Sequence, residues 1–352
     1  MAADLRRDRA LGAYIGAAIG DAMGGPVEAF HADRIKRYYG TITTLIPYQK
    51  PPGLIDLQPG YALRPDPGAI TDDTFIRADF TRFLIENKLP RTPHLLATWL
   101  VRHADFSKWW EPMTEPLYSV AKGAVSAEAA GLTARFQGGG AGWWTPIGII
   151  YAGKPEQAAA EARNLCRIWK APLEQDLNAA VQAGVAEAQR EGASVDSVLE
   201  VMFAQCRSLA QALLERGVAM ARKAKSSDEL IELIYQNCLV GNMPTAADAP
   251  LPRNLPPVDY TDEMYASILF AEQIPLALAA FVFAEGDPAR AIPQAVNFGR
   301  DADSVATTVG SLSGGLYGEA GLPKEWVTAV LEVNRNDIDI RGLAEQLLEL
   351  EA

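Results

Sequence analysis

The sequence predicts an all-α fold, and two properties of its apolar residues carry the prediction. Hydrophobic residues make up 49 % of the 352 residues, which is enough for a large core. Between the proline and glycine breaks they recur at spacings of three and four, the period of an amphipathic helix, whereas the alternation of a half-buried strand is scarce. Length alone allows one large domain or two.

Glycine marks two of the predicted helices, one near each end of the chain. In the helices predicted over residues 8–23 and 302–317, glycine recurs every fourth residue and leaves a bare face that another backbone can approach closely. These glycines are Gly12, Gly16, Gly20 and Gly24 in the first helix, and Gly310, Gly314 and Gly318 in and after the second. Antiparallel packing of the two faces would place Asp21 near Asp301 and Asp303.

Two proline-rich loops interrupt the other predicted helices, because proline cannot continue a helix. The first loop covers residues 36–70, and the second holds five prolines between residues 244 and 257. The second loop separates the two acidic clusters described below, so we place no boundary there and expect one domain over residues 1–352. The other helices are predicted over residues 73–87, 92–106, 115–130, 146–152, 155–168, 174–191, 195–224, 227–238, 262–285, 288–298, 323–334 and 338–350.

Charge and cysteine content restrict the partners and the compartment. With 44 acidic and 32 basic residues the net charge is −12, which argues against nucleic acid or an anionic membrane as partner, because both favour a basic face. No stretch has the roughly 20 apolar residues of a membrane-spanning helix. The three cysteines form no CxxC pair, so neither a disulfide framework nor a structural zinc site is indicated. We expect a cytoplasmic protein and leave its oligomeric state open.

Two acidic clusters, Thr71-Asp72-Asp73-Thr74 and Asp301-Ala302-Asp303-Ser304, open predicted helices. One interpretation is capping, since a hydroxyl group and first-turn carboxylates stabilise a helix N-terminus. The other is metal binding, because carboxylate and hydroxyl oxygens suit Mg²⁺, Mn²⁺ or Ca²⁺. The three histidines have no metal-ligand spacing, which disfavours zinc. Four carboxylates at two helix starts are sufficient to hold two divalent ions.

Three segments together resemble the ADP-ribosylglycohydrolase family. Residues 12–28 are similar to its N-terminal signature, residues 71–74 to its first metal motif, and residues 299–306, with the spaced glycines that follow, to its second. The order and separation of the segments agree as well. The resemblance implies an orthogonal helical bundle with two Mg²⁺ or Mn²⁺ ions in a central cleft. It also implies hydrolysis of a glycosidic bond to ADP-ribose or a related ribosyl compound.

The resemblance implies roles for individual residues. Glu28 falls on a glutamate that reaches the family's metal site from a mobile loop, and we expect it to assist the leaving group. Asp73 or Asp303 would orient the attacking water, and Asp21 is expected near the substrate. The implied metal ligands are Thr71, Asp72, Asp73, Asp301, Asp303 and Ser304, with serine standing where the family usually has threonine.

A glycine-rich loop departs from the family pattern. Where the family has asparagine and arginine, this chain has Gly138 and Trp143, and residues 166–172 lack the family's Thr-His pair. Glycine N–H groups can still hold an anion such as a diphosphate. The paired tryptophans either belong to the core or stack on a planar part of the substrate. On the second interpretation the substrate-binding residues of this loop are Gly138, Gly139, Gly140, Trp143 and Trp144.

These departures leave the leaving group open. The leading hypothesis is hydrolysis of an N- or O-glycosidic bond in a free or protein-linked ADP-ribosyl compound. One rival hypothesis is a small-molecule N-ribosidase that acts on a nucleoside-like substrate. Another is a catalytically silent ADP-ribose-binding or structural relative, which the intact set of acidic residues disfavours.

Overall fold

The computed structural model describes residues 3–48, 66–134, 139–239 and 269–350. Helices dominate these ranges, in which the one β pairing is an isolated antiparallel bridge between His31 and Gly299. The all-α prediction is therefore confirmed. In the described part of the chain, no helix has both the length and the apolar character needed to cross a membrane.

The helices follow one another along the chain with short connections. The α-helices are α1 (Ala3–Gly24), α2 (Ala32–Tyr39), α3 (Asp72–Glu86), α4 (Pro93–His103), α5 (Thr114–Ala121), α6 (Ala127–Thr133), α7 (Thr145–Ile150), α8 (Pro155–Leu165), α9 (Pro172–Ala188), α10 (Val195–Ala204), α11 (Ser208–Lys223), α12 (Ser227–Asn237), α14 (Phe270–Phe283), α15 (Pro288–Asn297), α16 (Ala302–Tyr317), α17 (Lys324–Asn334) and α18 (Ile340–Leu348). The 3₁₀ turns are η1 (Gly25–Val27), η3 (Phe106–Lys108), η4 (Glu111–Met113), η5 (Ala141–Trp144), η6 (Cys166–Ile168) and η8 (Glu319–Gly321).

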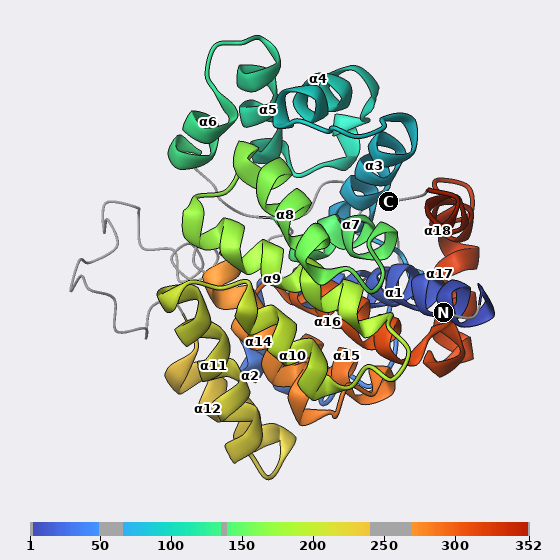
Figure 1. Ribbon diagram of the computed structural model, residues 1–352. Helices are drawn as coiled ribbons and strands as arrows, with labels where there is room; N and C mark the ends of the chain where they lie inside the picture. Colours follow the sequence, from blue (N-terminus) through green and yellow to red (C-terminus); the bar gives the residue numbers. More distant parts are fainter. Residues whose placement is uncertain (1–2, 49–65, 135–138, 240–268, 351–352) are drawn as a thin grey trace.

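Helices α1 and α16 form the centre of the molecule and pack against each other along their glycine faces (Figure 1). Gly12 lies against Gly314 at one end of the contact, and Gly24 lies against Ala302 at the other, so the helices run antiparallel. A Cβ atom added at Gly24 would lie 2.5 Å from the carbonyl oxygen of Ala302, an overlap that only glycine avoids. This confirms the predicted packing of the two helices.

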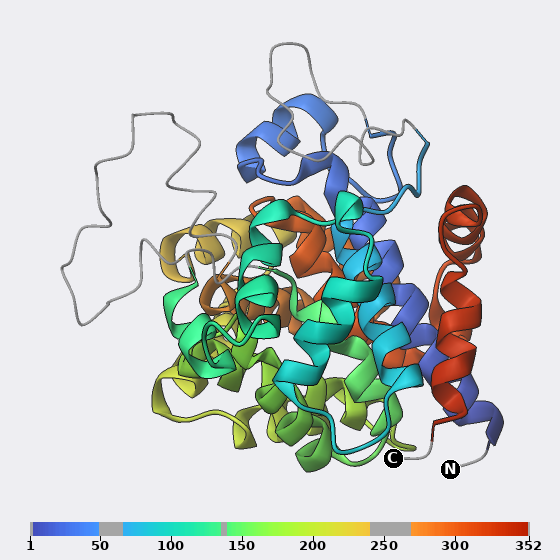
Figure 2. The same cartoon turned by 90° about the horizontal axis from the view of Figure 1, so that it is seen from above.

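The remaining helices surround this central pair. Helices α9, α14 and α15 pack against α16, while α17 and α18 lie beside α1, as the two perpendicular views show (Figure 1, Figure 2). Helices α8 and α10 cover α9 from outside, and α11 covers α14. The start of α16 is thereby enclosed on several sides, and residues 302–315 are all buried.

Three sequence predictions of element boundaries were wrong, because local turns and tertiary contacts interrupt the helices. The predicted helix over residues 195–224 is broken at 205–207, where Arg163 donates to the carbonyl oxygen of Gln205 at 2.8 Å and Arg207 binds Asp176 at 2.7 Å. The predicted helix over residues 115–130 divides into α5 and α6. The predicted loop 36–70 begins with residues that still belong to α2.

Two parts of the sequence predictions lie outside the described residues. The second proline-rich loop, with its prolines between residues 244 and 257, is one of them. The other is the start of the helix predicted over residues 262–285, of which the structure describes α14 from Phe270 onward.

Candidate metal centre and active site

The two acidic clusters lie together where α3 and α16 begin, beside the end of α1. Thr71 is the N-cap of α3, and its hydroxyl oxygen accepts a hydrogen bond from the backbone N–H of Asp73 at 3.4 Å. The same hydroxyl lies 2.6 Å from Oδ1 of Asp21 and 3.0 Å from Oδ2 of Asp303. One buried side chain thus connects α1, α3 and α16.

Asp21 supports the start of α3 with both of its carboxylate oxygens. These oxygens accept from the backbone N–H of Thr71 at 3.1 and 3.2 Å and from that of Thr74 at 3.1 Å. The Thr74 hydroxyl donates to Asp21 as well. Burial raises the pKa of Asp21, while the hydrogen bonds from Thr71 and Thr74 and the charge of Arg77 act against that rise. Asp21 is 0 % exposed, and these contacts orient the Thr71 hydroxyl toward Asp303.

Asp73 faces the glycine-rich loop across the site. The indole N–H of Trp143 donates to its Oδ1. A Cβ atom at Gly140 would lie 2.9 and 3.0 Å from the two carboxylate oxygens of Asp73 and 3.1 Å from Oγ of Ser304. Gly140 therefore brings Asp73 of the first cluster and Ser304 of the second against one short segment of backbone.

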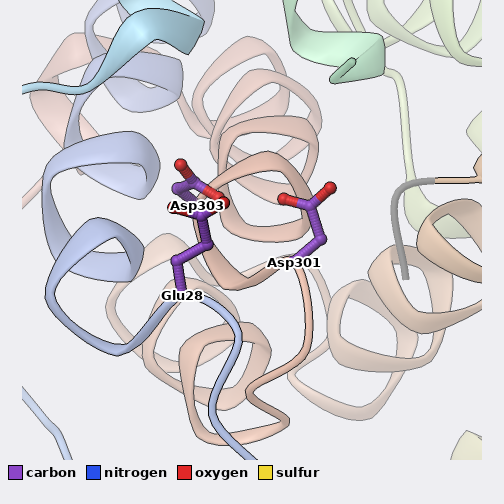
Figure 3. A group of neighbouring side chains, drawn as sticks. All are labelled: Glu28, Asp301 and Asp303. Carbon is purple, nitrogen blue, oxygen red and sulfur yellow. The ribbon is translucent and has the colours of Figure 1, made fainter. Parts of the chain in front are cut away.

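Asp301 and Asp303 flank the first turn of α16, and Glu28 approaches them from the segment after η1 (Figure 3). One oxygen atom from each of these three carboxylates lies within 4.8 Å of the others. Asp301 and Asp303 are buried, whereas Glu28 is half-buried. Three acidic groups from two distant parts of the sequence therefore share a space small enough for a cation.

Backbone pairing fixes Glu28 beside the second cluster. The N–H of Ala29 donates to the carbonyl oxygen of Arg300 at 2.7 Å, and the N–H of Arg300 donates to that of Phe30 at 2.8 Å. Ala29 has φ 64° and Arg300 φ 62°, a left-handed conformation that costs free energy for residues other than glycine. The surrounding contacts hold these residues there, next to Glu28 and Asp301.

Burial and mutual repulsion make the carboxylates of this site hard to ionise. The pKa of Asp73 is raised well above its usual range, chiefly by burial and next by the charge of Asp72, with the Trp143 hydrogen bond acting in the opposite direction. Burial raises the pKa of Asp303 as strongly, and the charge of Glu28 adds most to that effect. Positive charge placed among these groups would favour their ionised forms.

Sequence reasoning missed two supporting residues at the start of α14. The side-chain amide of Gln273 donates to Oδ2 of Asp301 at 2.5 Å, which opposes the rise that burial causes in the pKa of Asp301. Glu272 accepts from Arg300 at 2.7 and 3.1 Å. Two buried polar residues that open an otherwise apolar helix were the signal in the sequence, because such groups need partners.

The structure places the other predicted site residues as follows. Asp72 is half-buried in the first turn of α3. Gly139 is buried beside Trp143, whereas Gly138 lies outside the described residues. Trp144 is 2 % exposed, and its ring meets the edges of Phe80 and Trp169. Contact of these residues with substrate stays a prediction.

Comparisons with known proteins agree with this architecture. A family model described as ADP-ribosylglycohydrolase matches residues 1–352. Among solved structures, an "ADP-ribosylglycohydrolase-related protein complex" aligns with a TM-score of 0.58 over 99 % of this chain and 100 % of that chain. The sequence identity of that pair is 20 %, so the likeness shows a shared fold.

Curated relatives match over different lengths. The ADP-ribosylarginine hydrolase Tri1 of Serratia proteamaculans (strain 568) is 47 % identical over 57 residues, which span 16 % of this chain and 14 % of that relative's own length. The uncharacterized protein YegU of Escherichia coli (strain K12) is 23 % identical over 360 residues, 95 % of each chain. Because the family model covers every residue and the fold agrees, the chain belongs to the ADP-ribosylglycohydrolase family, a family of hydrolases.

Proposed function

We propose that this protein is a dinuclear-metal-dependent glycoside hydrolase that cleaves the bond between the ribose of an ADP-ribosyl group and its leaving group. The observation that carries the proposal is the convergence of Asp73, Asp301 and Asp303 with Glu28 around the Thr71 hydroxyl. Membership of the family supports glycosyl hydrolysis of ADP-ribosyl compounds. The relative that acts on ADP-ribosylarginine makes an arginine N-glycoside the first substrate to test.

The residues of the site fit a pair of divalent ions. Every candidate ligand offers oxygen, the donor that Mg²⁺ and Mn²⁺ prefer. In the described part of the chain, the buried Oδ2 atom of Asp73 has no hydrogen-bond partner, although buried polar atoms ordinarily have one. The proposed ligands are Thr71, Asp72, Asp73, Asp301, Asp303 and Ser304. When bound, two Mg²⁺ or Mn²⁺ ions supply the charge that neutralises the carboxylates and holds the ribose hydroxyls.

The acidic residues divide the proton transfers of hydrolysis between them. Asp73 or Asp303, held as carboxylate, orients a water toward the anomeric carbon, and the positive charge that develops on the ribose is stabilised by the same groups. Glu28 is the most exposed of the three grouped acids, and it donates a proton to the leaving group. Asp21 acts indirectly, since it holds Thr71 and the start of α3 in place.

Hydrolysis of ADP-ribosylarginine, of an O-linked ADP-ribosyl serine and of free nucleosides tests the proposal. We expect release of ADP-ribose from an ADP-ribosyl compound with Mg²⁺ or Mn²⁺, loss of that activity after chelation, and recovery when the ion is returned. Asp303→Asn should lower kcat/KM by about 100-fold or more, because it removes a charged oxygen at the reacting centre. Full activity after exhaustive chelation would overturn the metal requirement.

The same panel separates the alternatives. Cleavage of nucleosides without cleavage of ADP-ribosyl compounds would identify an N-ribosidase. Binding of ADP-ribose without turnover of any substrate would identify a silent relative. Either result would reject the proposed reaction.

A further inference from the structure

Trp143 connects the glycine-rich loop to the acidic site. Its side chain is 4 % exposed, and its indole N–H donates to Oδ1 of Asp73. A hydrogen bond from a neutral donor to a buried carboxylate is strong because it is charge-assisted. The second oxygen of Asp73, Oδ2, is buried without a hydrogen-bond partner among the described residues.

The loop backbone is shaped to bring this indole to Asp73. Gly139 has φ 94°, in the range that favours glycine, and a Cβ atom there would overlap the six-membered ring of Trp143. At Gly140 a Cβ atom would crowd both carboxylate oxygens of Asp73, at 2.9 and 3.0 Å. Two successive glycines therefore let the chain pass between the indole and the acidic site without moving either.

We propose that Trp143 is a positioning residue for the metal centre, an inference that rests on the proposed function. By holding Oδ1, the indole fixes the rotation of the Asp73 carboxylate and leaves Oδ2 to serve as the metal ligand. Groups that hydrogen-bond to a metal ligand orient it and raise the affinity for the ion. An indole does this without adding a positive charge that would compete with the ions.

Trp109 provides a matched control on the same helix. Its indole N–H donates to Oδ2 of Asp79 at 3.0 Å, and its side chain is 2 % exposed. Asp79 lies on α3 as Asp73 does, but Arg82 also binds it, at 2.8 Å, and it is outside the acidic site. Trp109→Phe therefore removes the same kind of bond from a buried aspartate without touching the proposed ligands.

The test compares wild type, Trp143→Phe and Trp109→Phe by calorimetric titration with Mn²⁺ alone and by thermal unfolding without metal. We expect the Trp143→Phe variant to bind Mn²⁺ about 10- to 100-fold more weakly, the usual effect of losing such a supporting hydrogen bond. The Trp109→Phe variant should keep the wild-type affinity, even though its melting temperature falls. Equal affinities for wild type and Trp143→Phe, or equal losses in the two variants, would overturn the inference.

A second substitution guards against misfolding of the phenylalanine variant. Benzothienylalanine at position 143 keeps the size of the tryptophan ring and replaces its N–H by sulfur, so it removes the donor without opening a cavity. We expect the same loss of Mn²⁺ affinity, and an unchanged affinity would overturn the inference. If wild type binds Mn²⁺ but cleaves no ADP-ribosyl compound, the proposed function fails while the role of Trp143 stands. If wild type binds no Mn²⁺, both fail.

Discussion

Arg77 is a buried cation on α3, one turn after Asp73. Its side chain is 0 % exposed, its Nη2 donates to the Thr74 hydroxyl at 3.0 Å, and its guanidinium lies 5.0 Å from the ring centre of Tyr14. Its charge lowers the pKa of Asp21 against the effect of burial. We interpret Arg77 as a built-in countercharge that keeps Asp21 ionised and able to hold Thr74.

A double-mutant cycle tests this interpretation. Arg77→Met should destabilise the protein by on the order of 3 kcal/mol, because it leaves the charge of Asp21 buried without compensation. The same substitution in an Asp21→Asn background should cost less, which gives a measurable coupling free energy in urea unfolding. Additive effects of the two substitutions would show that Arg77 and Asp21 are independent.

At the scale of single residues, the sequence identified the chemistry of the site but not its supports. Asp73 and Asp303 could be predicted because the spacing of acids and hydroxyls within a cluster is local. The contacts of Gln273 with Asp301 and of Trp143 with Asp73 could not, since they join residues of different helices and depend on their packing.

At the scale of secondary structure elements, the crossing of α1 and α16 decides whether the acidic clusters meet. Gly310 lies against the backbone of Gly16, where an added Cβ atom would be 2.5 Å from the Gly16 carbonyl carbon. Gly315, on the same helix, would meet only the Cβ of Ala188, at 3.2 Å. The two glycines differ in their surroundings although their helical environment is alike.

This difference predicts unequal effects of two alanine substitutions. Gly310→Ala should lower the free energy of unfolding by about 1–3 kcal/mol, because the backbone of α1 must move away. Gly315→Ala should change it little, since the gain in helix propensity of about 1 kcal/mol offsets the tighter contact. Urea unfolding of both variants measures this. Equal losses, or a stable Gly310→Ala variant, would contradict the close crossing.

The element boundaries show where local signals end. The glycine period correctly predicted the pairing of α1 with α16, because side-chain size along a helix is readable from sequence. The break between α10 and α11 was missed, since Arg163 and Asp176 hold the interrupted backbone from α8 and α9. Contacts of this kind override local helix propensity.

At the scale of the whole molecule, the buried acids make stability depend on pH and on metal. The pKa values of Asp73 and Asp303 are raised in the folded protein, so without metal the folded state binds more protons than the unfolded state above the ordinary range near about 4. Their contribution to stability is full below that range and is lost as the pH rises through the folded pKa values. Divalent ions, which need the ionised form, reverse this loss.

Thermal unfolding with and without Mn²⁺ checks this dependence. At about 100 times its Kd, an ion adds about 2.7 kcal/mol to the free energy of unfolding. The increase in melting temperature should be larger at about pH 7.5 than at about pH 5.5, because protons compete with the ion at the lower pH. Asp303→Asn should abolish most of the increase. A larger increase at the lower pH would contradict the raised pKa values.

The sequence by itself determined the helical class, the glycine faces and the two acidic clusters, because periodicity, residue size and charge are properties of short segments. Only the tertiary structure decided what surrounds the clusters. It brought Glu28 to Asp303 through the pairing of residues 29 and 300, and it turned the indole of Trp143 toward Asp73. These arrangements follow from how rigid helices pack, and the free energy of that packing is shared among residues far apart in the chain.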